Sequence, residues 1–171
     1  MKNLIFSFLA IIFISSLVFA AKGTAKITND SHGYSFYPPS GWNVEQSQGK
    51  CAGVVLSNSS QTIYIVVKPH HSNSLASFIK NESGWSGMGI KLGGEITDLG
   101  EGIEYVRAYQ AQQGYNIYID TVFIPISNEG GVVLINYTGN QNDAETAFGF
   151  DAQIMKTMEF SNPQSSGTGG G

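Results

Sequence analysis

Three runs rich in β-branched and aromatic residues lie between Ile103 and Gly139. They read IEYVRAYQAQQ, YNIYIDTVFIPI and VVLINYTG, and they are separated by Gly114 and by the sequence SNEGG. Such runs favour β-strands, and glycine adopts the backbone angles that tight reversals need. We therefore expect an antiparallel meander at the centre of the fold.

The meander strands carry apolar residues at both odd and even positions, fully in Val132–Tyr137 and nearly so in Tyr118–Ile126. Strands of this kind are buried on both faces, so something must cover each side of the sheet. Two helical patterns could supply the cover, one capped by Ser74 and one capped by Asn142. The sequence predicts a helix on each side of the sheet.

The length and charge of the chain limit the classes of protein to which it belongs. With 171 residues, 42% of them hydrophobic, the chain is long enough for one well-packed domain. The formal net charge is −4 and the basic residues are scattered singly. We expect no nucleic-acid partner, because nucleic-acid binding needs clustered positive charge.

The N-terminus has the pattern of an export signal. Lys2 precedes the apolar run LIFSFLAIIFISSLVF, and the small residues Ala20 and Ala21 follow. This arrangement predicts a cleavable signal peptide over residues 1–21 and a secreted or periplasmic protein. The alternative is an uncleaved N-terminal anchor, which would be the chain's one contact with a membrane.

The rest of the chain divides by composition. We expect a flexible lead over residues 22–32, a folded domain over residues 33–160 and a disordered glycine-rich tail over residues 161–171. The mature chain has one cysteine, Cys51, which cannot form an internal disulfide and is expected to be a small buried hydrophobe.

The segment YSFYPPSGW, from Tyr34 to Trp42, consists of an aromatic strand followed by proline and Ser-Gly-Trp. It resembles the opening of the PsbP-like and Mog1-like family. The later order agrees: the strand TIYIVVKP, a helix opened by Ser74, the meander, and a last helix leading into Met158. The resemblance covers about residues 33–160.

The resemblance implies an α+β fold, an α/β/α sandwich with a central antiparallel sheet. Members of the family are mostly non-enzymatic: photosystem subunits and assembly factors, a partner of the GTPase Ran, and many exported bacterial proteins. It therefore implies an exported binding or accessory protein with a protein partner, for example one that assists the assembly or stability of a membrane or envelope complex. Some PsbP proteins are linked to manganese or calcium, but no motif here corresponds to such a site, so we expect no cofactor.

Candidate partner-binding residues lie in and before the meander. Tyr105, Arg107 and Tyr109 share one strand face by their spacing of two, with the chain's only arginine between two tyrosines. Arginine and aromatic residues are enriched at interfaces, although the same pattern also occurs as ordinary decoration of a sheet. Trp85, in a glycine-rich stretch, either packs on the sheet or faces a partner. If Asp120 is buried in its apolar strand, Arg107 is its expected partner.

Two alternative functions depend on histidines and carboxylates. His70 and His71 are adjacent in an expected exposed loop, and Asp98 and Glu101 lie in an expected solvated turn. These four are weak candidates for a divalent metal site in a metal- or small-ligand-binding secreted protein. The less favoured alternative is a hydrolase that uses His70 or His71 with a nearby carboxylate, within about 4 Å of each other. No residue is assigned a catalytic role.

Overall fold

The computed structural model describes residues 21–22, 25–46, 53–112, 115–127 and 130–161. Residues 1–20 of the predicted signal peptide, Cys51, and the predicted tail beyond Ser161 lie outside these ranges. Within the described residues, no helix is both long and apolar enough to cross a membrane.

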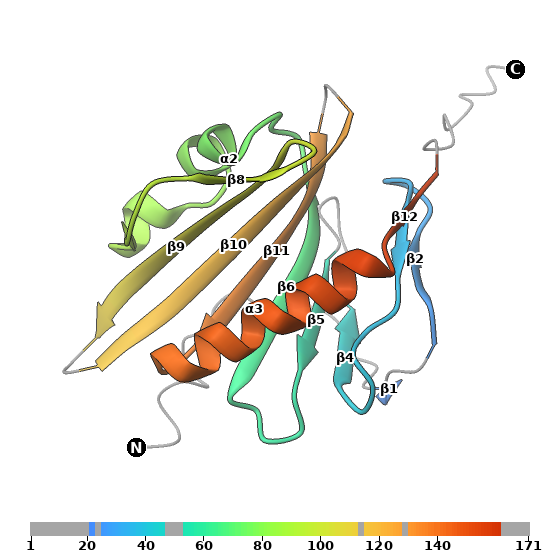
Figure 1. Cartoon of the computed structure of the whole chain (residues 1–171), viewed down its shortest axis with the longest axis horizontal. Coiled ribbons are helices and arrows are strands. Elements are labelled where there is room, and N and C mark those ends of the chain that lie inside the picture. The colour runs from blue at the N-terminus through green and yellow to red at the C-terminus, as the bar shows by residue number, and fades with distance from the viewer. Residues whose placement is uncertain (1–20, 23–24, 47–52, 113–114, 128–129, 162–171) are drawn as a thin grey trace, which may run out of the picture.

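The centre of the fold is the expected meander (Figure 1). Its strands are β9 (Ile103–Gln112), β10 (Tyr115–Ser127) and β11 (Gly130–Thr138), and both pairings are antiparallel. The prediction of three sequential antiparallel strands is confirmed.

Further strands extend the meander on both sides into one antiparallel sheet. Beyond β11 lie β6 (Ile63–His70), β5 (Val54–Ser57), β4 (Asn43–Gln46) and β1 (Ala21–Lys22), in that order. At the other edge β9 pairs with β7 (Lys91–Leu92) and β8 (Thr97–Gly100). Strand β6 continues through Pro69 to His70, although proline usually ends a strand.

One face of the sheet is covered by a helix and by a second, smaller sheet. The helix is α3 (Gln141–Lys156), and the small sheet contains β12 (Glu159–Phe160), β3 (Tyr34–Phe36) and β2 (Ile27–Asn29). Ala147 and Ile154 of α3 pack in one core with Tyr34 and Phe36. The helix cap is Asn140, whose side chain accepts a hydrogen bond from the Asp143 backbone N–H at 2.9 Å, so the prediction of Asn142 as cap was wrong by two residues.

The opposite face is covered by α2 (Leu75–Asn81) and the short 3₁₀ helix η1 (Trp85–Met88). Leu75, Phe78 and Trp85 form a second core with sheet residues such as Phe123. The predicted cap is confirmed, because the Ser74 hydroxyl accepts a hydrogen bond from the Ser77 backbone N–H at 3.2 Å.

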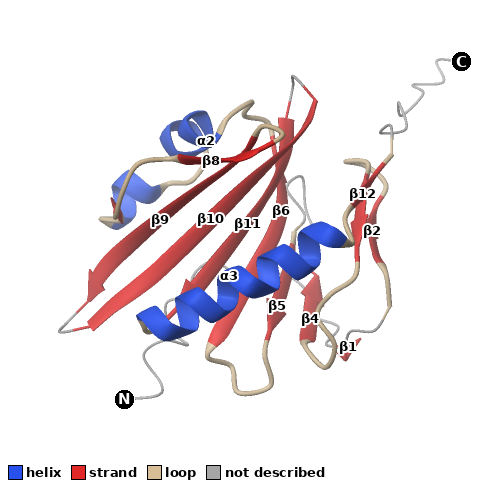
Figure 2. Cartoon of the chain, viewed as in Figure 1, coloured by secondary structure: helices blue, strands red, loops and turns tan. Residues whose placement is uncertain are grey.

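The expected α/β/α sandwich is therefore wrong, and the fold is β-rich. Antiparallel strands dominate, and the described residues contain two α-helices, one of them only 7 residues long (Figure 2). On the sheet face under α3, the helix covers one part and the small sheet covers another. The family resemblance implies a full layer of helices on each face, whereas the described residues supply one long helix and one short helix.

The expected flexible lead over residues 22–32 is wrong for Ile27–Asn29. Residues Ile27–Asn29 form β2, which pairs with β3, and Ile27 is buried in the core beneath α3. Burial of this isoleucine stabilises the pairing of a segment whose polar neighbours suggested a loop.

A carboxylate on β9 helps to hold α2 on the sheet. Glu104 accepts a hydrogen bond from the Leu75 backbone N–H at 2.5 Å, which satisfies a donor in the first turn of the helix. We expect Glu104→Ala to lower the free energy of unfolding by about 1 kcal/mol, the usual effect of losing a cap. Chemical denaturation measures this loss, and Glu95→Ala, at an exposed position, is the control and should change stability by less than about 0.5 kcal/mol.

Candidate functional site

Four half-buried side chains line the part of the sheet that lies next to α3 without being covered by it. They belong to Tyr105, Arg107 and Tyr109 on β9 and to Tyr118 on β10, and we call them the tyrosine–arginine face. Tyr118 lies directly opposite Tyr109 in the strand register. The predicted period-two arrangement of the three β9 residues is confirmed, since Val106 and Ala108 between them are buried in the core on the other side.

The covering helix leaves this face open because of the direction in which it crosses the sheet. Figure 1 shows α3 running obliquely over β11, β6 and β5, with β9 beyond it. The helix nevertheless touches the border of the face, because the ring of Phe148 packs on that of Tyr105 with 4.9 Å between centroids. The face is thus bounded on one side by α3.

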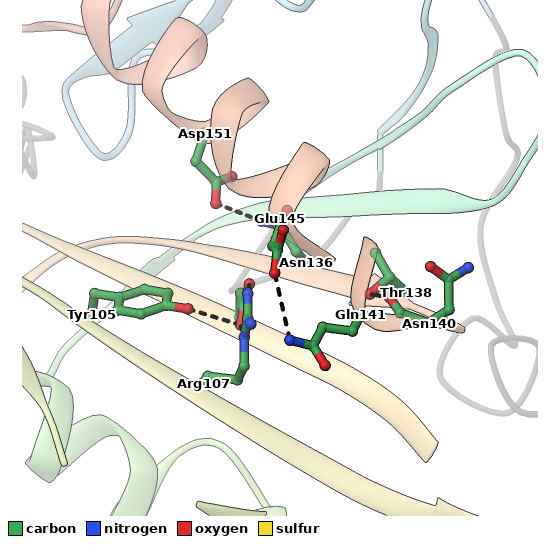
Figure 3. Close-up of polar contacts among 9 residues, drawn as sticks. Tyr105, Arg107, Asn136, Thr138, Asn140, Gln141, Glu145 and Asp151 are labelled. Carbon is green, nitrogen blue, oxygen red and sulfur yellow. Dashed lines mark hydrogen bonds and ion pairs between the residues drawn. The ribbon is translucent and has the colours of Figure 1, made fainter. Parts of the chain in front are cut away.

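Arg107 is held in a fixed orientation by Asp120. The Arg107 Nε donates to Asp120 Oδ1 at 2.7 Å and its Nη2 donates to Oδ2 at 2.8 Å, while the Tyr105 hydroxyl donates to Oδ1 at 3.1 Å. Figure 3 shows Tyr105 and Arg107 converging on the same point from β9. The predicted partnership of Arg107 with a buried Asp120 is confirmed.

The two members of the Arg107–Asp120 ion pair differ in their exposure to solvent. The Asp120 side chain is fully buried and the Arg107 side chain remains 28% exposed. The hydrogen bonds to Asp120 raise the pKa of Arg107 above its usual value, and burial raises the pKa of Tyr105 to about 12. At physiological pH the face therefore carries one permanent cation and a neutral phenol.

A second polar pair lies beneath α3, next to the first. The Asn136 side-chain N–H₂ of β11 donates to Asp151 Oδ2 of α3, and both side chains are buried. In the strand register Asn136 lies directly opposite Asp120. The Oδ1 atoms of Asn136 and Asp151 have no hydrogen-bond partner among the described residues, and burial raises the pKa of Asp151 well above its usual value.

The polar border of the face at α3 is formed by exposed residues of the first two helical turns. Gln141 donates to Glu145 at 3.5 Å, and Figure 3 shows both side chains on the helix above the β9 and β10 strands. Tyrosines, a cation and amide and carboxylate groups thus occur together on one side of the sheet, a composition that is common at protein interfaces.

Trp85 does not belong to this face. It is 3% exposed and packs in the core beneath α2, on the other side of the sheet from Arg107. Of the two interpretations of Trp85 in the sequence, packing against the sheet is confirmed. The prediction that it contacts a partner together with Tyr105, Arg107 and Tyr109 is corrected, because a side chain this buried cannot reach another molecule.

The structure does not bring the four candidate metal ligands together. His70 is 4% exposed at the end of β6, whereas His71 is exposed, and so are Asp98 on β8 and Glu101 in the following turn. Among the described residues no group of three or more histidine, cysteine, aspartate or glutamate side chains could hold a metal ion. The prediction of an exposed loop is corrected for His70.

The geometry that the hydrolase alternative requires is also not found in the described ranges. Neither ring nitrogen of His70 has a hydrogen-bond partner there, although a catalytic histidine must be oriented by one. Ser72 donates its hydroxyl hydrogen bond to Glu82 and not to a histidine. Asp98 instead accepts a hydrogen bond from the Gly100 backbone N–H at 2.7 Å, which is a turn contact.

Sequence reasoning missed three residues of this region, namely Tyr118, Asn136 and Asp151. A signal existed for two of them: Asp151 lies at helical spacing between the core residues Ala147 and Ile154, and Asn136 interrupts the run VVLINY. A polar residue in an apolar stripe needs a buried partner. The two interruptions could have been matched to each other.

Comparison with known proteins adds little to this description. No family model matches the chain and no curated protein matches it. Among solved structures the chain is similar to a protein in a 1.50 Å crystal structure from Bacteroides thetaiotaomicron VPI-5482, with 14% sequence identity and a TM-score of 0.44. The similarity covers 83% of this chain and 50% of that one, so the chain spans about half the length of its neighbour. A similarity this low carries no argument about function.

Proposed function

We propose that this chain is an exported binding protein that acts without catalysis and contacts a protein partner through the tyrosine–arginine face. The observation that carries the proposal is the partly exposed side chain of Arg107, held by buried Asp120 between two half-buried tyrosines. The role implied by the PsbP-like resemblance, that of an accessory factor for a membrane or envelope complex, is consistent with such a surface.

The fixed orientation of Arg107 makes it a favourable contact residue. A free arginine side chain loses about 2 kcal/mol of rotamer entropy when a partner immobilises it. Here the two hydrogen bonds to Asp120 already hold the Nε and Nη2 side of the guanidinium before any partner arrives. The cost of binding is therefore reduced, as for other preorganised surfaces.

The neighbouring tyrosines supply the remaining chemistry of an interface. Tyrosine and arginine are the residue types most often found where binding energy is concentrated. Tyr109 and Tyr118 lie side by side in the register, and neither ring belongs to the two described cores, so both can give contact area to a partner. Each ring is only half buried in the free chain.

The test is site-specific photocrosslinking of the full chain in cells that export it. A photoreactive amino acid at position 109 or 118 should crosslink one discrete protein. Tyr109→Ser combined with Tyr118→Ser should reduce capture of that protein, assayed with a probe on the border residue Gln141, by at least about tenfold, the effect of losing hot-spot side chains worth more than 1.4 kcal/mol.

The matched control is Tyr37, a tyrosine that is 46% exposed and follows β3 in the small sheet. A probe at position 37 should not capture the same protein, and Tyr37→Ser should leave capture through Gln141 unchanged. Melting curves establish that each variant remains folded. If positions 109, 118 and 37 crosslink the same set of proteins equally, or if the double variant binds normally, the proposal is wrong.

A further inference from the structure

A buried histidine, whose ring nitrogens have no hydrogen-bond partner among the described residues, lies at the junction between the sheet and the layer formed by α2 and η1. His70 is the last residue of β6, is 4% exposed, and has no partner for either ring nitrogen among the described residues. A buried polar group in this state is costly, and in native proteins it calls for an explanation. The tyrosine–arginine face on the other side of the sheet does not involve it.

The His70 ring is tightly packed on several sides. Its ring lies 4.6 Å from that of Phe123 and 5.6 Å from that of Phe78, measured between centroids. A β-carbon placed on Gly131 would lie 3.0 Å from His70 Nε2, so the hairpin of β10 and β11 closes tightly over the ring. If the His70 ring is protonated, its positive charge either remains in this apolar site or displaces the residues that enclose the ring.

The charged groups around His70 have opposing effects on the protonation of its ring. Glu82, just after α2, attracts a positive charge on the ring, whereas Lys68 on the same strand and the neighbouring His71 repel it. Desolvation is the largest effect, and it lowers the pKa of His70 to about 4. The neutral ring is therefore the form that the closed structure accepts.

Glu82 also holds the chain segment that follows His70. Glu82 accepts hydrogen bonds from the Ser72 hydroxyl and from the His71 backbone N–H, which links the end of α2 to the segment between β6 and α2. His71 is also close enough to His32, in the turn between β2 and β3, for their charges to interact. All three histidines of the chain thus lie around this junction.

We propose that the junction of β6 and α2 is an acid-sensitive latch, in which protonation of His70 releases the α2 and η1 layer from the sheet. Release uncovers the apolar residues of the sheet that Leu75, Phe78 and Trp85 cover at neutral pH. The tyrosine–arginine face is on the other side and keeps its ion pair. Acid therefore changes one face of the sheet and spares the other.

The size of the effect follows from linkage. In the opened form His70 titrates near the ordinary value of about 6.5. The closed form takes up its proton only near pH 4. Opening therefore becomes more favourable as the pH falls below 6.5, by about 30-fold at pH 5 and by at most about 300-fold below pH 4.

Hydrogen exchange of the full chain, followed by mass spectrometry at pH 7.5 and pH 5 and corrected for intrinsic rates, tests the latch. Amides in residues 75–88 should open about 30-fold more at pH 5, while those of β10 and β11 stay protected. His70→Leu should remove this pH response and His71→Asn should keep it. A response that is the same in the His70→Leu variant, or that is spread over the whole sheet, overturns the proposal.

If His70→Leu does not fold, proton NMR titration of the three histidines in the unmodified chain decides the matter. One imidazole should titrate between about pH 4 and pH 6.5, at the same pH at which the resonances of Phe78 and Trp85 are lost. Three midpoints near pH 6.5 with α2 still in place would overturn the latch.

Discussion

Arg107→Ala should lower the free energy of unfolding by about 3–5 kcal/mol, a large effect for a residue that is part of the surface. The variant leaves the Asp120 carboxylate in the sheet with no cation, although its side chain is fully buried. The hydroxyl of Tyr105 would be the one remaining side-chain donor to it among the described residues. Urea denaturation followed by tryptophan fluorescence measures the loss.

A double variant separates the role of the pair from that of the charge left behind. Replacing both residues by leucine removes the buried carboxylate together with its partner, so Arg107→Leu with Asp120→Leu should recover most of the stability lost in Arg107→Ala. If Arg107→Ala costs less than about 1 kcal/mol, Asp120 does not depend on the guanidinium. The ion pair would then be ordinary surface decoration.

Residues whose replacement destabilises the fold cannot be used to probe binding. Alanine at Arg107 or at Trp85 would disturb the fold, the first through Asp120 and the second through the core beneath α2. A lost partner in such variants would not distinguish binding from unfolding. Tyr109 and Tyr118 are better probes, because their half-exposed rings can be removed without leaving a buried charge.

The parts of the fold that the sequence predicted correctly depend on local patterns. The meander follows from the β-branched runs and the glycines between them, and the cap at Ser74 follows from its position before the helical pattern. The contact of Arg107 with Asp120 could be predicted because adjacent antiparallel strands place them opposite each other.

The parts that were missed depend on distant contacts. Strand β2 exists because β3 and the core beneath α3 accept Ile27, which nothing in the neighbouring residues indicates. Likewise Pro69 can lie inside β6, although proline usually ends a strand, and this places His70 inside the protein and not in a loop. The sandwich was expected from the family resemblance together with the two helical patterns, and neither indicated that β2, β3 and β12 would supply part of the cover.

Asp151 gives the free energy of unfolding of this protein an unusual dependence on pH. Most carboxylates in folded proteins have a lowered pKa and stabilise the fold as the pH rises. Asp151 is fully buried, its Oδ1 has no partner among the described residues, and burial raises its pKa. The folded state therefore binds this proton more tightly than the unfolded state does.

The sign of the effect follows from that difference. Below about pH 4 the carboxyl is protonated in both states and costs nothing. As the pH rises further the unfolded chain ionises first, and the fold loses about 1.4 kcal/mol per pH unit until the pH reaches the raised pKa of Asp151. Asparagine cannot ionise, and it can still accept the hydrogen bond from Asn136.

We therefore expect Asp151→Asn to gain stability relative to the unmodified chain as the pH rises above about 4, until the pH reaches the raised pKa of Asp151. Denaturant unfolding at several pH values measures the difference, from which the contribution of His70 cancels because both proteins contain it. Glu145→Gln, at an exposed position of the same helix, should show no such trend. The prediction is wrong if the difference in free energy of unfolding between Asp151→Asn and the unmodified chain stays constant or falls as the pH rises. Asp151 would then be ionised at little cost in the folded protein, and groups other than Asn136 would have to stabilise its charge under α3.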